Sequence, residues 1–130
     1  MTKKILLIED EPDFRLFLAT LLLDHGYQTI ALEEGEDELF AIEEQKPDLV
    51  LLDFMMPGRS GLSVCKAIRE RWDPDQLPIL LVTGLFQGGG AGLDELEQLF
   101  AEHSVAFPEG VIEKPIKPPE LIEAVKRLTD

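Results

Sequence analysis

Short apolar runs alternate with segments of helical period along this chain. The runs have the length of strands, are bounded by charged residues, Gly or Pro, and lie at Ile5–Ile8, Thr29–Leu32, Leu49–Leu52, Ile79–Val82 and Gly110–Ile112. After the first run, apolar residues recur every three or four positions from Phe14 to Leu22. Pro12 suits a first helical position and Gly26 a helix stop, so the pattern predicts a helix between them.

The same period predicts four further helices, at Glu36–Gln45, Gly61–Trp72, Leu93–His103 and Pro119–Leu128. Strands that alternate with helices of this length pair in parallel through right-handed crossovers, with helices on both faces of the sheet. The run at residues 49–52 is apolar at every position, which is typical of a strand buried on both faces. The sequence therefore predicts an α/β fold, a doubly wound (βα)5 parallel sheet of five strands.

Length and charge narrow the classes of function. A chain of 130 residues has room for one compact core, so we expect residues 1–130 to form a single domain. The formal net charge of −14 repels nucleic acid and anionic lipid, so direct binding of either by this domain is not expected. The sequence shows no membrane span or secretory signal, and its single cysteine, Cys65, is expected to be a small buried hydrophobe. These features are typical of a cytoplasmic protein.

Polar residues follow four of the predicted strands, where ligands of doubly wound sheets bind. They are Glu9-Asp10, Asp53, Thr83-Gly84 and Lys114-Pro115. Carboxylates gathered in one crevice repel each other and need a cation, and oxygen ligands without His or Cys favour Mg²⁺. A metal, a fixed cation and a hydroxyl around one carboxylate are suited to phosphoryl transfer.

Taken singly, each of these residues also has an ordinary structural explanation. Residues 9–11 could be loop acids of an acidic protein, Thr83 a β-branched strand residue and Lys114 a surface charge before a turn proline. Gly61 and Gly84 are either small residues at a close approach or plain turn glycines. The functional hypothesis depends on the joint placement of the charged residues at one predicted sheet edge.

These motifs together resemble the receiver domains of response regulators in two-component signalling, the CheY-like family. The resemblance covers about residues 4–128 and rests on Asp53-Phe-Met-Met-Pro-Gly-Arg-Ser-Gly61, Glu9-Asp10, Thr83-Gly84 and Lys114-Pro115, in that family's order. It implies a flavodoxin-like strand order 2-1-3-4-5. It also implies that Asp53 is the phosphoacceptor, attacking a phosphohistidine on a histidine kinase or a histidine phosphotransfer protein.

The resemblance implies roles for the other residues of the motifs. Asp10, Asp53 and the backbone carbonyl of Met55 would ligate Mg²⁺, with Glu9 acting mainly through water. Lys114 would pair with the phosphoryl oxygens, and a cis peptide bond between Lys114 and Pro115 would aim the lysine inward. Thr83 would move its hydroxyl onto the phosphoryl group, and this movement would be the switch. The domain would catalyse only its own phosphorylation and dephosphorylation and would control an output domain or target protein, with a phosphorylation-dependent dimer as a further option.

The sequence departs from the family pattern at two places. Val111 stands where the family usually has an aromatic residue, three positions before the lysine. Thr83 and Lys114 are 114 − 83 = 31 positions apart, more than is usual, and the excess centres on the glycine-rich residues 87–92. No Gly-Lys-Ser/Thr follows that run, so it predicts a mobile loop, not a phosphate-binding P-loop.

Three alternative functions share this topology. A phosphohydrolase that resembles the haloacid dehalogenases needs an acid two residues after its nucleophile, where this chain has Met55. A flavodoxin-like FMN carrier needs a Ser/Thr-rich phosphate loop, where this chain has the acids at 9–11. A degenerate receiver, acting as a phosphorylation-independent interaction module, would be consistent with Val111 but would not need the charged residues of the site.

Overall fold

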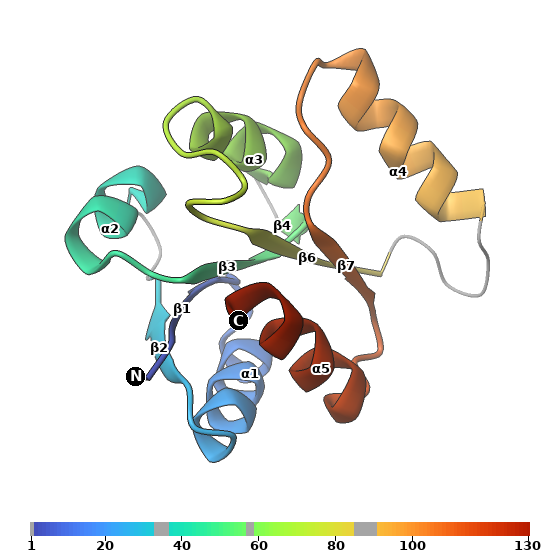
Figure 1. Cartoon of the computed structure of the whole chain (residues 1–130). Helices are drawn as coiled ribbons and strands as arrows, with labels where there is room; N and C mark the ends of the chain where they lie inside the picture. Colours follow the sequence, from blue (N-terminus) through green and yellow to red (C-terminus); the bar gives the residue numbers. More distant parts are fainter. Residues whose placement is uncertain (1, 33–36, 57–58, 85–90) are drawn as a thin grey trace.

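The structure is a computed structural model that describes residues 2–32, 37–56, 59–84 and 91–130 (Figure 1). Its elements follow one another as β1 (Lys4–Ile8), α1 (Pro12–Asp24), β2 (Gln28–Ala31), α2 (Glu38–Gln45), β3 (Leu49–Asp53), β4 (Met55–Met56), β5 (Arg59–Ser60), α3 (Gly61–Arg69), β6 (Ile79–Thr83), α4 (Ala91–Glu102), β7 (Gly110–Glu113) and α5 (Pro118–Thr129).

Five of these strands form a parallel sheet in the order β2-β1-β3-β6-β7. Among the described residues β4 and β5 pair only with each other, so β6 and β7 are the fourth and fifth strands of this sheet. The predicted order 2-1-3-4-5 is therefore confirmed. Figure 1 shows α1 and α5 on one face of the sheet and α2 and α3 on the other.

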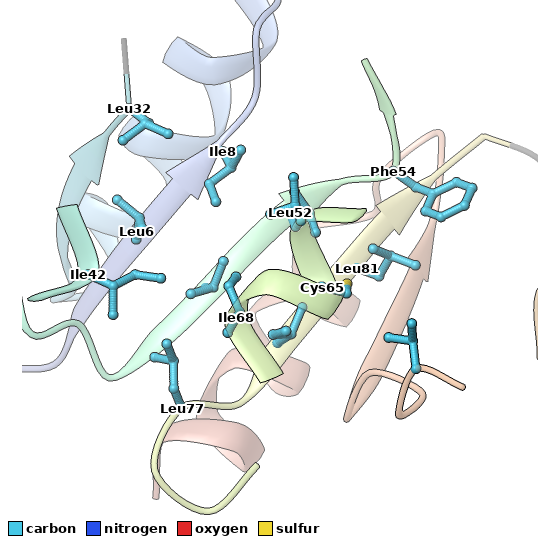
Figure 2. Packing of buried hydrophobic residues seen from close by; sticks show 14 of the residues in the cluster. Leu6, Ile8, Leu32, Ile42, Leu52, Phe54, Cys65, Ile68, Leu77 and Leu81 are labelled. Carbon is cyan, nitrogen blue, oxygen red and sulfur yellow. The ribbon is translucent and has the colours of Figure 1, made fainter. Parts of the chain in front are cut away.

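Each face of the sheet carries its own apolar cluster. Along β1, Ile5 and Leu7 pack with α1 and α5, whereas Leu6 and Ile8 pack on the opposite face. Figure 2 shows this second cluster, in which side chains of the sheet meet those of α2 and α3. Alternate residues of a strand point to opposite faces, so a strand covered on both sides must be apolar at every position.

The ends of α2 and α3 differ from the predicted ones. Helix α2 begins at Glu38, not at Glu36, which lies outside the described residues. Its N-cap is Asp37, whose carboxylate accepts the backbone N–H of Leu39 at 2.8 Å, and an N-cap residue is not itself helical. Helix α3 ends at Arg69, not at Trp72, and the Arg69 guanidinium donates to the Trp72 carbonyl oxygen at 3.2 Å in the turn that follows.

Helix α4 begins within the predicted glycine-rich loop. Residues 87–90 lie outside the described residues, but Gly92 is helical, so the loop prediction is wrong at that position. Leu96 and Phe100 of α4 are buried in the cluster on the α2 and α3 face, and this packing stabilises the helix although Gly92 disfavours it locally.

The lone cysteine lies in that same cluster. Cys65 is 1% exposed, as expected for a small buried hydrophobe, and burial raises the pKa of its thiol to about 12. The thiol therefore stays protonated and unreactive at neutral pH. Within the part of the chain that the structure describes, no helix combines the length and apolarity needed to cross a membrane.

Candidate functional site

The carboxyl ends of four sheet strands meet at one edge. Ile8 of β1 pairs in register with Leu52 of β3, and Asp53 of β3 pairs with Val82 of β6. The next residues along the chain are therefore neighbours at this edge. In this way parallel pairing brings residues that are distant in sequence, from Glu9 to Lys114, to a single place.

Two of these residues belong to strands rather than to loops. β3 and β6 each extend one residue beyond the predicted end, so that Asp53 and Thr83 are the last strand residues. Both are buried, Asp53 at 5% exposure and Thr83 at 0%. The sheet therefore fixes the backbone of both residues more firmly than a loop would.

Three carboxylates converge at this edge. One oxygen from each of Glu9, Asp10 and Asp53 lies within 4.8 Å of the others. Glu9 is 4% exposed, whereas Asp10 faces solvent. Three acids at this separation repel one another when ionised, so a proton or a cation is needed to stabilise the cluster.

Glu9 carries that proton in the metal-free protein. Burial and, to a smaller extent, the adjacent Asp53 carboxyl raise the pKa of Glu9 to about 8, against the opposing effects of the Glu11 N–H and the Lys114 charge. Its Oε1 accepts the Glu11 N–H at 3.0 Å. Its Oε2 is buried and accepts no hydrogen bond from a donor among the residues described.

These residues fit a hard divalent cation. Mg²⁺ prefers oxygen ligands and is typically held by one or two carboxylates together with water. The site offers three carboxylates and a buried oxygen without a donor, Glu9 Oε2, at the mouth of the sheet edge. The donor set therefore matches Mg²⁺ rather than a metal that favours nitrogen or sulfur ligands.

Lys114 supplies a fixed positive charge next to Asp53. Its Nζ donates to Asp53 Oδ2 at 3.3 Å and lies 4.4 Å from the centroid of the Phe14 ring. Its backbone N–H donates to the Thr83 carbonyl at 2.8 Å, which ties the residue to the end of β6. The Lys114–Pro115 bond is cis, as the resemblance implies.

For Thr83 and Met55 the structure gives the position in the fold, but their predicted roles stay predictions. Thr83 lies on the same edge as Asp53, but the contact of its hydroxyl with a phosphoryl group stays a prediction. Met55 lies in β4, two residues after Asp53, and the role of its carbonyl stays a prediction as well. Val111 of β7, which stands in place of the family's aromatic residue, is half-buried and packs against the cluster on the α2 and α3 face.

Sequence reasoning missed one residue of the site. Phe14 was predicted only as part of the apolar stripe of α1, yet its ring contacts the Lys114 ammonium. The signal that could have pointed to it is its position in the first turn of α1, four residues after Asp10.

The proton on Glu9 predicts a pH-dependent stability. Its pKa in the folded protein, about 8, exceeds the ordinary value of 4.5. As the pH rises from 4.5 to about 8, the unfolded chain loses the proton while the folded state keeps it. The free energy of unfolding therefore falls by about 1.4 kcal/mol per pH unit at most.

Glu9→Gln removes this titration. With a chelator present, we expect the variant to gain about 1–3 kcal/mol of unfolding free energy over the parent on going from pH 4.5 to pH 8. Urea unfolding of both proteins at the two pH values measures the gain. An equal difference between the proteins at both values would contradict the assignment.

Comparison with known sequences identifies relatives over nearly the whole chain. Residues 5–126 match the family described as Response regulator receiver domain. The chain is 32% identical over 126 residues to the DNA-binding response regulator MtrA of Mycolicibacterium smegmatis, covering 97% of this chain and 50% of that protein. It is 30% identical over 128 residues to the phosphate regulon transcriptional regulatory protein PhoB of Rhizobium meliloti, covering 98% and 52%. The chain thus spans about half the length of the curated relatives it matches.

Solved structures of the same kind share the fold. The BeF3-activated N-terminal receiver domain of Klebsiella pneumoniae RstA superimposes with a TM-score of 0.78 at 29% identity, covering 98% of this chain and 100% of that one. The receiver domain of a sensor histidine kinase from Pseudomonas aeruginosa superimposes with a TM-score of 0.78 at 25% identity, covering 99% of this chain and 98% of that one. That structure has a magnesium ion coordinated in its active site cleft. Since the family match extends over residues 5–126 and the strand-end acids converge on one buried carboxylate, the chain belongs to the response regulator receiver domain family.

Proposed function

We propose that Asp53 accepts a phosphoryl group from a histidine kinase or a histidine phosphotransfer protein, and that the domain then switches conformation to control an output. The observation that carries this proposal is the surroundings of Asp53. Its buried carboxylate has two further carboxylates within 4.8 Å and the Lys114 ammonium at 3.3 Å. Phosphoryl transfer depends mainly on positioning and on neutralising charge, and these groups supply both.

Mg²⁺ is the proposed cofactor, held by Asp10 and Asp53, with the Met55 carbonyl as a further ligand and Glu9 acting mainly through water. When bound, the ion neutralises the carboxylates and the phosphoryl oxygens. Glu9 would release its proton as the cation enters, because a nearby positive charge lowers the pKa of a carboxyl.

The chain's own residues would carry the transfer. A carboxylate oxygen of Asp53 attacks phosphorus, and the bond from phosphorus to the imidazole nitrogen of the donor histidine breaks. The imidazole leaves with the bonding electron pair. Lys114 would then face the transferred phosphoryl oxygens, and Thr83 would donate its hydroxyl to one of them. We assign the domain no substrate turnover beyond its own phosphorylation and dephosphorylation.

The proposed output is indirect. MtrA is named a DNA-binding response regulator and PhoB a transcriptional regulatory protein, and this chain spans half their length. With a net charge of −14, the described domain itself is poorly suited to bind DNA. We therefore propose that it acts in the cytoplasm by controlling an output domain or a target protein, with dimerisation on phosphorylation as one route.

Phosphorylation-independent binding is the less favoured function. A module that only binds partners would have no use for three mutually repelling carboxylates and a lysine at one sheet edge. Retaining such a cluster costs stability, as the raised pKa of Glu9 indicates.

The deciding experiment is the intact mass of the protein after incubation with Mg²⁺ and a small acyl phosphate donor. We expect a gain of one phosphoryl group, and no gain when a chelator replaces the metal. No gain under any donor concentration would contradict the proposal, and an equal gain with and without metal would contradict the role of Mg²⁺.

Two neighbouring acids should respond differently to loss of charge. Asp10→Asn removes a member of the carboxylate cluster, so Mg²⁺ should bind roughly tenfold more weakly, about 1.4 kcal/mol. Glu11→Gln is the matched control, because Glu11 is exposed and lies outside the cluster. Titration of Mg²⁺ by calorimetry measures both affinities. Equal losses would mean that the acids act only as a diffuse negative field.

A further inference from the structure

The ammonium of Lys114 contacts an aromatic ring as well as a carboxylate. Its Nζ lies 4.4 Å from the centroid of the Phe14 ring and 3.3 Å from Asp53 Oδ2. Phe14 belongs to the first turn of α1, whereas Lys114 follows β7 and precedes α5. Figure 1 shows α1 and α5 on the same face of the sheet, so two distant segments meet at this lysine.

A lysine in this position needs to be held. Its side chain is 32% exposed, and its long stem has many rotamers, so solvent competes with Asp53 for the ammonium. The face of an aromatic ring attracts a cation through its quadrupole. Because the ring makes this attraction without a hydrogen-bond acceptor, it can restrict the ammonium and still leave its N–H groups available to phosphoryl oxygens.

The ring of Phe14 is itself fixed in place. It is half-buried and packs against the apolar cluster on the α1 and α5 face. Helix α1 begins at Pro12, two residues after Asp10. The same short segment therefore supplies an acid of the cluster and the ring beside the lysine.

We propose that Phe14 is a positioning residue for phosphoryl transfer, whose ring holds the Lys114 ammonium next to Asp53 before the phosphoryl group arrives. This inference rests on the proposed function of Asp53. Without the ring, Lys114 spends part of its time away from the acceptor. The rate of transfer then falls in proportion to the fraction of molecules in which the ammonium is in place.

Three variants test the proposal through the rate of phosphorylation by a small acyl phosphate with saturating Mg²⁺. Phe14→Leu keeps an apolar side chain but removes the ring, and should slow the reaction roughly two- to fivefold. Phe14→Tyr keeps the ring face and should react at the parental rate. Phe17→Leu is the matched control, because it removes the ring that lies next to Phe14, and it should also react at the parental rate.

A second measurement follows the lysine itself. In the parent and in Phe14→Tyr, the ring current should shift the NMR signals of the Lys114 ε-methylene protons upfield, and Phe14→Leu should abolish the shift. A parental rate in Phe14→Leu, or an equal slowing in Phe14→Tyr or Phe17→Leu, would overturn the proposal. If the parent takes up no phosphate, the proposed function fails, and the ε-methylene shift alone then decides whether the ring holds the ammonium.

Discussion

Asp53→Asn should abolish phosphoryl uptake. The change replaces the nucleophilic carboxylate with an amide of almost the same shape, and an amide oxygen carries too little charge to form a stable bond to phosphorus. It also removes one of the three carboxylates of the cluster and the partner of Lys114. We expect the rate of uptake to fall by more than about a hundredfold, close to 3 kcal/mol of barrier or more, measured by intact mass with Mg²⁺ and a small acyl phosphate.

Asp13→Asn is the matched control for this result. Asp13 lies in the first turn of α1 and is exposed, so the same chemical change there leaves the acidic cluster intact. The control should gain a phosphoryl group as the parent does. Full labelling of Asp53→Asn would mean that another residue accepts the group.

Gly61→Ala should destabilise the domain by about 2–3 kcal/mol. A Cβ at Gly61 would lie 2.8 Å from the Cα of Phe54 and 2.9 Å from its carbonyl oxygen. Backbone atoms cannot move away as the end of a flexible side chain can, so α3 or the chain after β3 must shift. Phe54 directly follows Asp53, and its ring packs against Phe100 with centroids 6.2 Å apart, so this shift would also disturb the core.

Gly84→Ala is the matched control, because it replaces a second glycine of the same sheet edge and so shows the effect of the substitution without a close backbone contact. A Cβ at Gly84 would lie 3.9 Å from Lys114, an ordinary contact distance. Urea unfolding should therefore show a loss below about 1 kcal/mol for Gly84→Ala and a clearly larger loss for Gly61→Ala. Similar losses in the two variants would show that the close approach to Phe54 does not matter.

These two glycines show where sequence reasoning stops. Both were open to two explanations, a close approach or a plain turn, and only the structure separates them. Gly61 is at a close approach, whereas among the described residues a Cβ at Gly84 would meet only Lys114, at an ordinary contact distance. The difference depends on how close each glycine lies to Phe54 or to Lys114 in the folded chain. Local sequence motifs do not contain these distances.

The site was predictable to the extent that it follows from strand ends. Asp53 and Lys114 were placed together from sequence because each follows an apolar run, and parallel strands end at a common edge. The contact between Lys114 and Phe14 was not predictable in this way. It depends on the side-chain conformations of a helix and a loop, which hydrophobic period does not specify.

The fold was predictable because the buried strands are short continuous apolar runs and the amphipathic helices have a clear period. The ends of these elements were less predictable. The hairpin of β4 and β5 has two residues in each strand, too few to show a period. The start of α2 depends on the Asp37 carboxylate as its cap, and a capping residue looks like any other acid in an acidic segment.

The central claim is that the phosphoryl group is carried by the carboxylate of Asp53. Borohydride reduces an acyl phosphate to an alcohol and so converts a phosphorylated aspartate into homoserine. After phosphorylation, reduction and proteolysis, peptide mass spectrometry should find homoserine at position 53 and unchanged aspartate at position 10. Homoserine at another position, or stable phosphate on a serine or threonine, would contradict the account.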